Sequence, residues 1–299
     1  MAAWNRHPLA RTLNRYVTAW QRNRPRAIFR RVLEFPPIPS EPHPGSFVVL
    51  CEADKLLDGY WCAWSWLRFL HPWLRLRLFV DGEVSDASRA VFARLFPGGE
   101  IASMPELLVS LPPPPENLSK LLQHYRYARK LSLILHLQSA GPLLYCDSDV
   151  LAFRRPQALL ARIEHGSPNA YMTDQNDPSQ DPWIVARARA LDLPMREELN
   201  SGLLWIARDS LDRSLVERLL EGWHPEVYCH FTEQTILAAL LPASGAQPLP
   251  REEYTLNARG MFFYEGDIPC EELTVRHYVG IVRHRMYSRA YPFLARQAG

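Results

Sequence analysis

The chain has 299 residues, of which 47% are hydrophobic and 22% charged, and its formal net charge is only +2. This length and apolar content suit one large α/β domain or two small ones. The small net charge gives no overall field that would attract nucleic acid, so no nucleic-acid partner is expected. No stretch approaches the roughly 20 uninterrupted apolar residues of a membrane span, so we expect a soluble protein, at most peripheral to a membrane.

The five cysteines are predicted to be reduced thiols of the core. Their number is odd, and the sequence holds no Cys-x-x-Cys pair and no spacing typical of a zinc site. A reducing compartment fits this usage, and we therefore expect a cytoplasmic protein. The cysteines stand at Cys51, Cys62, Cys146, Cys229 and Cys270.

Residues 1–34 predict a basic amphipathic helical appendage. Residues 1–33 hold eight arginines and no carboxylate, and apolar side chains recur there at helical spacing up to a break at Pro25. Three roles remain open: a helix docked on the main domain, a surface for anionic lipid at the membrane, or a contact for an acidic partner. The segment 35–45, "FPPIPSEPHPG", predicts an extended proline-rich linker. The apolar positions are Leu9, Leu13, Tyr16, Val17 and Trp20.

From residue 46 to 299 strand and helix patterns alternate, as in a single α/β domain. Such alternation predicts a three-layer α/β sheet whose ligands lie outside the carboxyl ends of the strands. The expected strands are 46–53, 74–81, 100–104, an apolar run ending near 147, 169–174, 200–207 and 273–280. The expected helices are 56–72, 85–97, one long helix from about 118 to 139, 156–164, 181–194, 210–223 and 231–241.

The stretch "PLLYCDSDVLAF" (142–153) places Asp147 and Asp149 at the end of an apolar run. Side chains at positions i and i+2 of a strand point to the same side, so these two carboxylates can share one cation. An oxygen-rich site suits Mn²⁺ or Mg²⁺, which keep open positions for phosphate oxygens. The alternative is an exposed turn with two solvated carboxylates, because Asp-x-Asp also arises by chance.

A second group of residues lies in "RHYVGIVRHRMY" (276–287). His277 follows an expected strand, Gly280 allows the backbone to come close to a ligand, and Arg283 stands six residues after the histidine. A nitrogen ligand and a phosphate-binding cation are what the two aspartates need to complete a metal site that grips a diphosphate. A surface histidine without a ligand is the simpler alternative.

The order of four motifs resembles the family 8 glycosyltransferases, which include glycogenin and bacterial lipopolysaccharide galactosyl- and glucosyltransferases. The motifs are "YCDSDVL", "NSGLLWIA", "EQTILAALL" and His-Tyr-x-Gly-x-x-Arg, and the resemblance runs from about residue 46 to residue 287. It implies the GT-A fold, a Rossmann-like three-layer mixed sheet. It also implies a retaining transferase that moves a hexose from a UDP-sugar donor, UDP-glucose or UDP-galactose, with the help of Mn²⁺ or Mg²⁺.

The resemblance also implies a role for each matching position. Asp147, Asp149 and His277 would hold the cation, and Gly280 and Arg283 would face the diphosphate. Glu233 and Gln234 would border the donor sugar. From their chemistry we expect Gln234 to steady the positive charge that develops on the sugar and Glu233 to be the nucleophile if a covalent intermediate formed. Further donor contacts would come from Asp54 under the uracil, and from Asn200, Gly202 and Arg129 at the sugar, with Lys130 replacing Arg129 if the register differs by one.

Two positions depart from the family pattern. Arg283 replaces the usual lysine, which keeps the charge but presents a planar fork in place of a point charge. Glu233 stands where aspartate is usual and is one methylene longer. Two other functions stay open: a non-catalytic nucleotide-sugar-binding or adaptor protein, and a sugar-1-phosphate nucleotidyltransferase, although no glycine-rich loop follows the first strand.

The acceptor is expected to be a glycan, a lipopolysaccharide or a protein. Residues 173–183 and 259–267 mix carboxylates, amides and aromatic rings, as carbohydrate sites often do. The first of these segments is equally explained by ordinary turn chemistry. The basic, aromatic tail 282–299 predicts a helix that closes over the donor site, with contact to anionic lipid or an acidic acceptor as alternatives.

Overall fold

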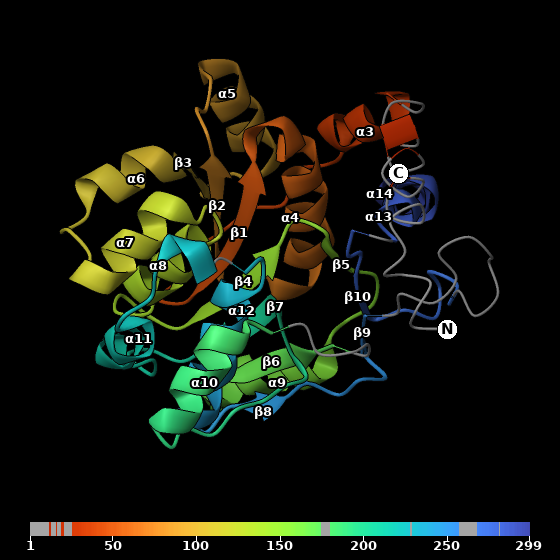
Figure 1. Cartoon of the computed structure of the whole chain (residues 1–299). Coiled ribbons are helices and arrows are strands. Elements are labelled where there is room, and N and C mark those ends of the chain that lie inside the picture. The colour runs from red at the N-terminus through yellow and green to blue at the C-terminus, as the bar shows by residue number, and fades with distance from the viewer. Residues whose placement is uncertain are drawn as a thin grey trace.

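The computed structural model describes residues 12, 16, 19, 20, 26–174, 180–227, 229–256, 268–280 and 282–299. Among these residues a seven-stranded mixed sheet forms the centre, in the order β3-β2-β1-β4-β7-β6-β8 (Figure 1). Strands β3, β2, β1 and β4 are parallel to one another, whereas β7 runs antiparallel to both β4 and β6. The strands are β1 (Ser46–Glu52), β2 (Arg75–Asp81), β3 (Glu100–Ser103), β4 (Leu143–Asp147), β6 (Ala170–Thr173), β7 (Leu199–Ile206) and β8 (Gln247–Pro248).

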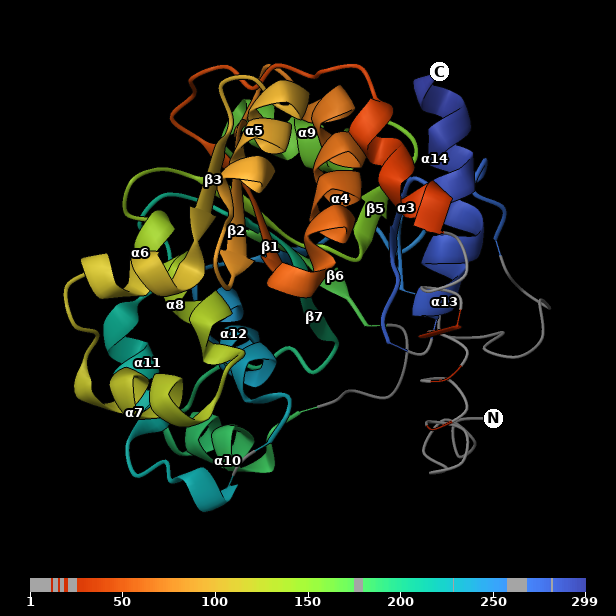
Figure 2. The same cartoon turned by 90° about the horizontal axis from the view of Figure 1, so that it is seen from above.

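Helices cover both faces of this sheet, which confirms the predicted three layers (Figure 2). Along β1, Phe47 and Val49 enter one core and Val48 enters the other, because successive side chains of a strand point to opposite faces. The first face carries α3 (Arg26–Arg31), α4 (Leu56–Leu70), α5 (Asp86–Leu95), α9 (Gln157–His165) and α14 (Tyr291–Ala298). The second carries α7 (Glu116–His124), α8 (Ala128–Leu137), α10 (Pro182–Ala190), α11 (Arg213–Leu220) and α12 (Thr232–Ala243), and α6 (Met104–Ser110) follows β3.

A small second sheet, in the order β5-β10-β9, brings the C-terminal part of the chain to the end of β4. Its strands are β5 (Val150–Ala152), β10 (Val275–His277) and β9 (Tyr254–Thr255). β5 follows β4 after the two-residue turn formed by Ser148 and Asp149. β5 pairs antiparallel with β10, in the register that sets His277 opposite Val150. This pairing places His277 beside the turn that carries Asp149.

Several helices begin at residues whose side chains cap the first turn. Ser85 accepts a hydrogen bond from Ser88 N at the start of α5, and Asp212 accepts one from Ser214 N at the start of α11. Asp181 accepts from Trp183 N, and Pro182 follows at the first position of α10. These caps satisfy the backbone N–H groups that a first helical turn leaves without partners.

The prediction of one long helix from about 118 to 139 is wrong. The chain forms α7 and α8, and Tyr125 between them is in an extended conformation. Tyr125 is buried, and its hydroxyl donates to His230 O at 2.5 Å. The tertiary contact of this ring therefore overrides the helical pattern around it, and the break sets the direction of α8 and of Lys130 in its first turn.

The segment before residue 46 is packed on the domain from residue 26 onward. Phe29 and Val32 are buried, and Trp61 Nε1 donates to Phe29 O at 3.1 Å. In the predicted linker, Ser40 Oγ accepts from Leu76 N at 2.7 Å, which ties the extended chain to β2. The division of the chain into an appendage, a linker and a domain stays a prediction.

Earlier in the chain, Tyr16 and Trp20 are helical and 71% and 52% exposed, respectively. Leu9, Leu13 and Val17 of the predicted apolar stripe lie outside the described residues. The two exposed rings thus belong to a segment whose predicted apolar face is described only in part.

The C-terminal tail is helical and packs against α3 and α4. It consists of α13 (Arg283–Arg285), a π-helical segment (Met286–Ala290) and α14. The hydroxyls of Tyr287 and Tyr291 both donate to the buried Asp58 of α4, at 3.3 and 2.7 Å. These contacts anchor the backbone that carries Arg283. All five cysteines are free, as predicted, and no described helix has the length and apolar character to span a membrane.

Candidate functional site

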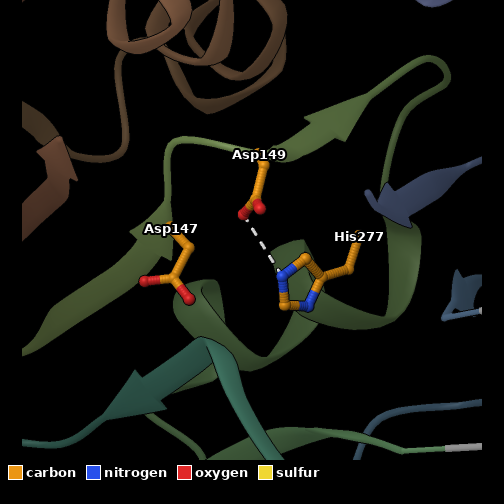
Figure 3. A group of neighbouring side chains, drawn as sticks. All are labelled: Asp147, Asp149 and His277. Carbon is orange, nitrogen blue, oxygen red and sulfur yellow. Dashed lines mark ion pairs between the residues drawn. The ribbon is translucent and has the colours of Figure 1, made fainter. Parts of the chain in front are cut away.

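Two carboxylates and one imidazole meet where β4 leaves the central sheet (Figure 3). Asp147 ends β4, Asp149 lies in the following turn, and His277 ends β10. One ligand atom from each residue lies within 4.8 Å of the other two. Asp149 and His277 are buried, and His277 Nε2 lies 3.2 Å from Asp149 Oδ1. The three predicted metal ligands are therefore brought together.

The side chain of Asn200 orients His277. Asn200 Oδ1 lies 3.0 Å from His277 Nδ1 and also accepts from Gly202 N at 3.0 Å. Because a backbone N–H can only donate, the atom facing Gly202 is the amide oxygen, and Nδ1 of the imidazole must then carry a proton. Nε2, on the side of Asp149, is left as the nitrogen that can bind a metal.

Because Gly202 has no side chain, the imidazole of His277 can pack directly against its backbone. A Cβ atom at this position would lie 2.4 Å from His277 Cε1 and 2.7 Å from His277 Nδ1. These distances are shorter than van der Waals contact, so no larger residue fits without displacing the ring. The predicted sugar contacts Asn200 and Gly202 thus lie against the metal-ligand candidate His277.

Arg283 lies on the other oxygen of Asp149. Its Nη2 donates to Asp149 Oδ2, while the Nε of the same guanidinium is buried without a hydrogen-bond partner among the described residues. Burial disfavours the Asp149 carboxylate, but Arg283, together with the imidazole of His277 on the other carboxylate oxygen, outweighs burial and holds the pKa of Asp149 well below its ordinary value. Asp149 in turn raises the pKa of Arg283 against the effect of burial.

Asp147 is held by a second group of polar residues. Tyr145 donates its hydroxyl to Asp147 Oδ1 at 2.6 Å, and Lys130 Nζ lies 3.4 Å from the same oxygen. Lys130 also donates to Ser201 Oγ at 2.9 Å and lies 3.5 Å from Glu233 Oε1. Burial alone would lower the pKa of Lys130, but Asp147 and Glu233 outweigh it and raise that pKa. Lys130 is therefore a buried ammonium shared between two carboxylates.

Glu233 and Gln234 lie in the first turn of α12, beside the start of β7. Burial raises the pKa of Glu233 to about 7, with Lys130 opposing the shift and Asp147 adding to it. Gln234 Oε1 accepts from Ser201 N at 3.2 Å, which orients the Gln234 amide. Both predicted catalytic residues thus share the neighbour Ser201 with Lys130.

The two candidate side chains of "YARK" have different partners. Arg129 donates to Asp81, which also accepts from Arg126 at 2.5 Å, at the carboxyl end of β2. Lys130, one residue later, enters the cluster around Asp147. Of the two side chains, Lys130 is the one that lies beside Asp147, while the contact of either with a donor sugar stays a prediction.

The two remaining predicted residues lie at exposed positions. Asp54 belongs to the 3₁₀ turn Ala53–Lys55 that follows β1, at the same edge of the sheet as Asp147. Gly280 follows β10, and a Cβ atom placed on it would meet nothing within 4 Å. Packing against the described residues therefore does not require glycine at position 280.

The residues present fit a divalent cation. Two carboxylates that face one point repel each other unless a positive charge lies between them, and two carboxylates with one imidazole form a donor set suited to Mn²⁺ or Mg²⁺. The proton on His277 Nδ1, assigned from the bond to Asn200, meets the usual requirement that a metal-binding histidine donates through its other nitrogen.

No protein-family model matches the chain, and no curated protein is significantly similar to it in sequence. Solved structures are similar in fold. The galactosyltransferase LgtC, in complex with donor and acceptor sugar analogs, is 18% identical with a TM-score of 0.56, over 85% of this chain and 96% of that one. An active-site mutant of LgtC is also 18% identical, with a TM-score of 0.50 over 78% of this chain and 87% of that one. The chain has the GT-A glycosyltransferase fold.

Three polar residues near the site were not identified from the sequence motifs. Tyr145 lies two residues before Asp147 on the same strand, so its side chain shares the face of that aspartate. Ser201 stands inside the motif "NSGLLWIA", between two residues that were singled out. Asp81, the partner of Arg126 and Arg129, ends a predicted strand. Its position at the carboxyl edge of the sheet is the sequence feature from which it could have been identified.

Proposed function

We propose that the protein is a metal-dependent retaining glycosyltransferase that moves a hexose from a nucleotide sugar, UDP-glucose or UDP-galactose, to an acceptor hydroxyl. The convergence of Asp147, Asp149 and His277 at the carboxyl edge of a GT-A sheet carries this proposal. Arg283, on the oxygen of Asp149, adds a cation suited to a diphosphate.

The main role proposed for this site is to stabilise the negative charge that develops on the leaving group. A Mn²⁺ or Mg²⁺ ion held by the two aspartates and His277 would supply positive charge to the departing nucleoside diphosphate. Asn200 keeps His277 Nε2 turned toward the carboxylates, and Tyr145 holds Asp147. Arg283 would donate to the diphosphate, and the open face of Gly280 would let the backbone approach it.

The residues at the start of α12 are proposed to handle the donor sugar. Gln234, oriented by Ser201 N, would steady the positive charge that develops on the sugar ring. Glu233, held by Lys130, would position the sugar. For retention, the acceptor hydroxyl would attack from the face that the leaving group departs, and its proton would pass to an oxygen of the leaving phosphate. The carboxylate of Glu233 is the candidate nucleophile if a covalent intermediate forms.

The proposal is tested by measuring donor hydrolysis. The full chain is incubated with Mn²⁺ and a panel of nucleotide sugars, and released UDP is quantified, since water can replace the acceptor. We expect slow release of UDP from one UDP-hexose, its loss in EDTA, and its loss in Asp149→Ala. Failure of every nucleotide sugar to bind, with and without metal, would contradict the proposal.

For the acceptor we propose a glycan, lipopolysaccharide or protein hydroxyl. Of the two segments predicted to contact it, residues 259–267 and residues 175–179 of the segment 173–183 lie outside the described residues. The exposed Tyr16 and Trp20 support a peripheral contact of the N-terminal segment with a membrane surface. Co-sedimentation with anionic and with zwitterionic vesicles tests this contact, and equal absence from both pellets would contradict it.

A further inference from the structure

Asp149 has two neighbours that compete for its charge. Asp149 Oδ1 lies 3.2 Å from His277 Nε2, and Asp149 Oδ2 accepts a hydrogen bond from Arg283. The pair is sheltered, because the Asp149 side chain is 9% exposed and that of Arg283 28%. An ion pair this shielded from water is screened far less than one at the surface. A cation that needs Asp149 as a ligand must therefore displace Arg283 or share the carboxylate with it.

From this geometry we infer that Arg283 is a latch that couples cation binding to nucleotide binding. With no diphosphate present, the guanidinium neutralises Asp149 and weakens the site for a divalent cation. When a nucleoside diphosphate arrives, Arg283 exchanges the carboxylate for phosphate oxygens, and Asp149 is released to the cation. This inference rests on the proposed function, because it takes Asp149 to be a metal ligand and Arg283 a diphosphate contact.

The bonding of the guanidinium supports such an exchange. An arginine has five N–H donors, and the Nε of Arg283 is buried with no hydrogen-bond partner among the described residues. A buried donor without a partner is unfavourable, and a diphosphate offers several acceptors in place of one carboxylate oxygen. Arg283 is therefore better satisfied by a diphosphate than by Asp149 alone.

The backbone beneath Arg283 is anchored, so the side chain has to make the exchange. Val282 and Met286, on either side of Arg283, are fully buried. The following turn is tied to α4 by the hydrogen bonds of Tyr287 and Tyr291 to Asp58. A long side chain on a fixed backbone can swing between two partners by rotamer changes alone, without opening the fold.

The decisive measurement is the affinity for Mn²⁺ alone, by calorimetry on the full chain without nucleotide. Arg283→Gln should bind Mn²⁺ about tenfold more tightly than the unaltered protein, because it frees Asp149. Asp149→Asn should bind it at least about tenfold more weakly, because it removes a ligand. Arg296→Gln, which removes an exposed arginine of α14 at some distance in sequence from the site, should bind as the unaltered protein does.

Two results would overturn the latch, and they are distinguishable. If Arg283→Gln leaves the Mn²⁺ affinity unchanged while Asp149→Asn weakens it, the metal site stands and the latch is wrong. If Asp149→Asn leaves the affinity unchanged, the proposed metal site is wrong and the latch fails with it. Should Arg283→Gln not fold, Arg283→Lys serves instead: its point charge pairs less well with the carboxylate, so Mn²⁺ binding should still tighten, by a smaller factor.

The release step is tested from the side of the nucleotide, with UDP as the probe in EDTA. Asp149→Asn should bind UDP more tightly than the unaltered protein, because it frees Arg283. Asp147→Asn is the matched control, because it removes the same charge close by but Asp147 is held by Tyr145 and Lys130. If both variants gained the same affinity for UDP, the gain would come from the lost negative charge alone. The proposed exchange of Arg283 between Asp149 and the diphosphate would then be wrong.

Discussion

Asn200 Oδ1 lies 3.0 Å from His277 Nδ1, although 77 residues separate the two in the chain. The contact fixes both the ring orientation and the position of its proton, so Asn200 is a positioning residue for the proposed metal ligand. In metal sites such partners change the affinity for the metal by 10- to 100-fold. Asn200 therefore acts by orienting the imidazole of His277, in addition to any contact with a sugar.

Asn200→Ala is expected to weaken Mn²⁺ binding by about 10- to 100-fold, measured by calorimetry, because the imidazole loses its acceptor. Asn200→Asp should bind nearly as the unaltered protein does, because a carboxylate oxygen can accept from both His277 Nδ1 and Gly202 N. Asn117→Ala, at a partly buried position on α7, is the matched control. Unchanged affinity in Asn200→Ala would contradict the positioning role.

Gly202→Ala is expected to lower the free energy of unfolding by about 1–3 kcal/mol and to abolish Mn²⁺ binding, because the added Cβ would lie 2.4 Å from His277 Cε1. Gly280→Ala gives the contrast, since its Cβ would meet nothing within 4 Å. We expect it to keep the stability and the Mn²⁺ affinity but to lose affinity for UDP. Urea unfolding and two titrations separate these outcomes, and a stable, metal-binding Gly202→Ala would refute the packing argument.

The stability of the protein should fall as the pH rises through the titration of Glu233. Burial foremost raises the pKa of this carboxyl from 4.5 to about 7. Below pH 4.5 it is protonated in both the folded and the unfolded state, whereas between about 4.5 and 7 only the folded state keeps the proton. The folded state therefore loses roughly 3 kcal/mol across this window.

Free energies of unfolding at pH 5 and pH 8 test this dependence. Glu233→Gln should lose less stability between these two values than the unaltered protein, by roughly 3 kcal/mol. Glu271→Gln, at an exposed position, should follow the unaltered protein. Parallel pH profiles for Glu233→Gln and the unaltered protein would rule out a raised pKa at Glu233.

Lys130→Met is expected to destabilise the protein by about 3–5 kcal/mol at pH 8, because it leaves the carboxylates of Asp147 and Glu233 without their shared cation. The loss should be smaller at pH 5, where Glu233 is protonated. Lys120→Met removes an exposed lysine that pairs with Glu116 at 2.6 Å and should change little, because water screens that pair. Equal thermal unfolding midpoints for both lysine variants would argue against the buried network.

Local sequence patterns were sufficient for most elements of the central sheet. The apolar run before Asp147 became β4, and the alternation of strand and helix became three layers, because side-chain periodicity is a local property of the chain. The pattern failed at Tyr125, where a helical sequence is interrupted. There, the hydroxyl of a buried ring reaches His230, and no local propensity reports such a partner.

The sequence by itself determined which kinds of residue the site contains: two aspartates at a strand end, a histidine, and an arginine in a motif near the C-terminus. Only the tertiary structure decided that β5 pairs with β10 in the register that sets His277 beside Asp149, and that Lys130 enters the cluster in preference to Arg129. Pairing between distant strands and the direction of a helix depend on how the whole core packs. The residues that contact one another in space therefore cannot be identified from their neighbours along the chain.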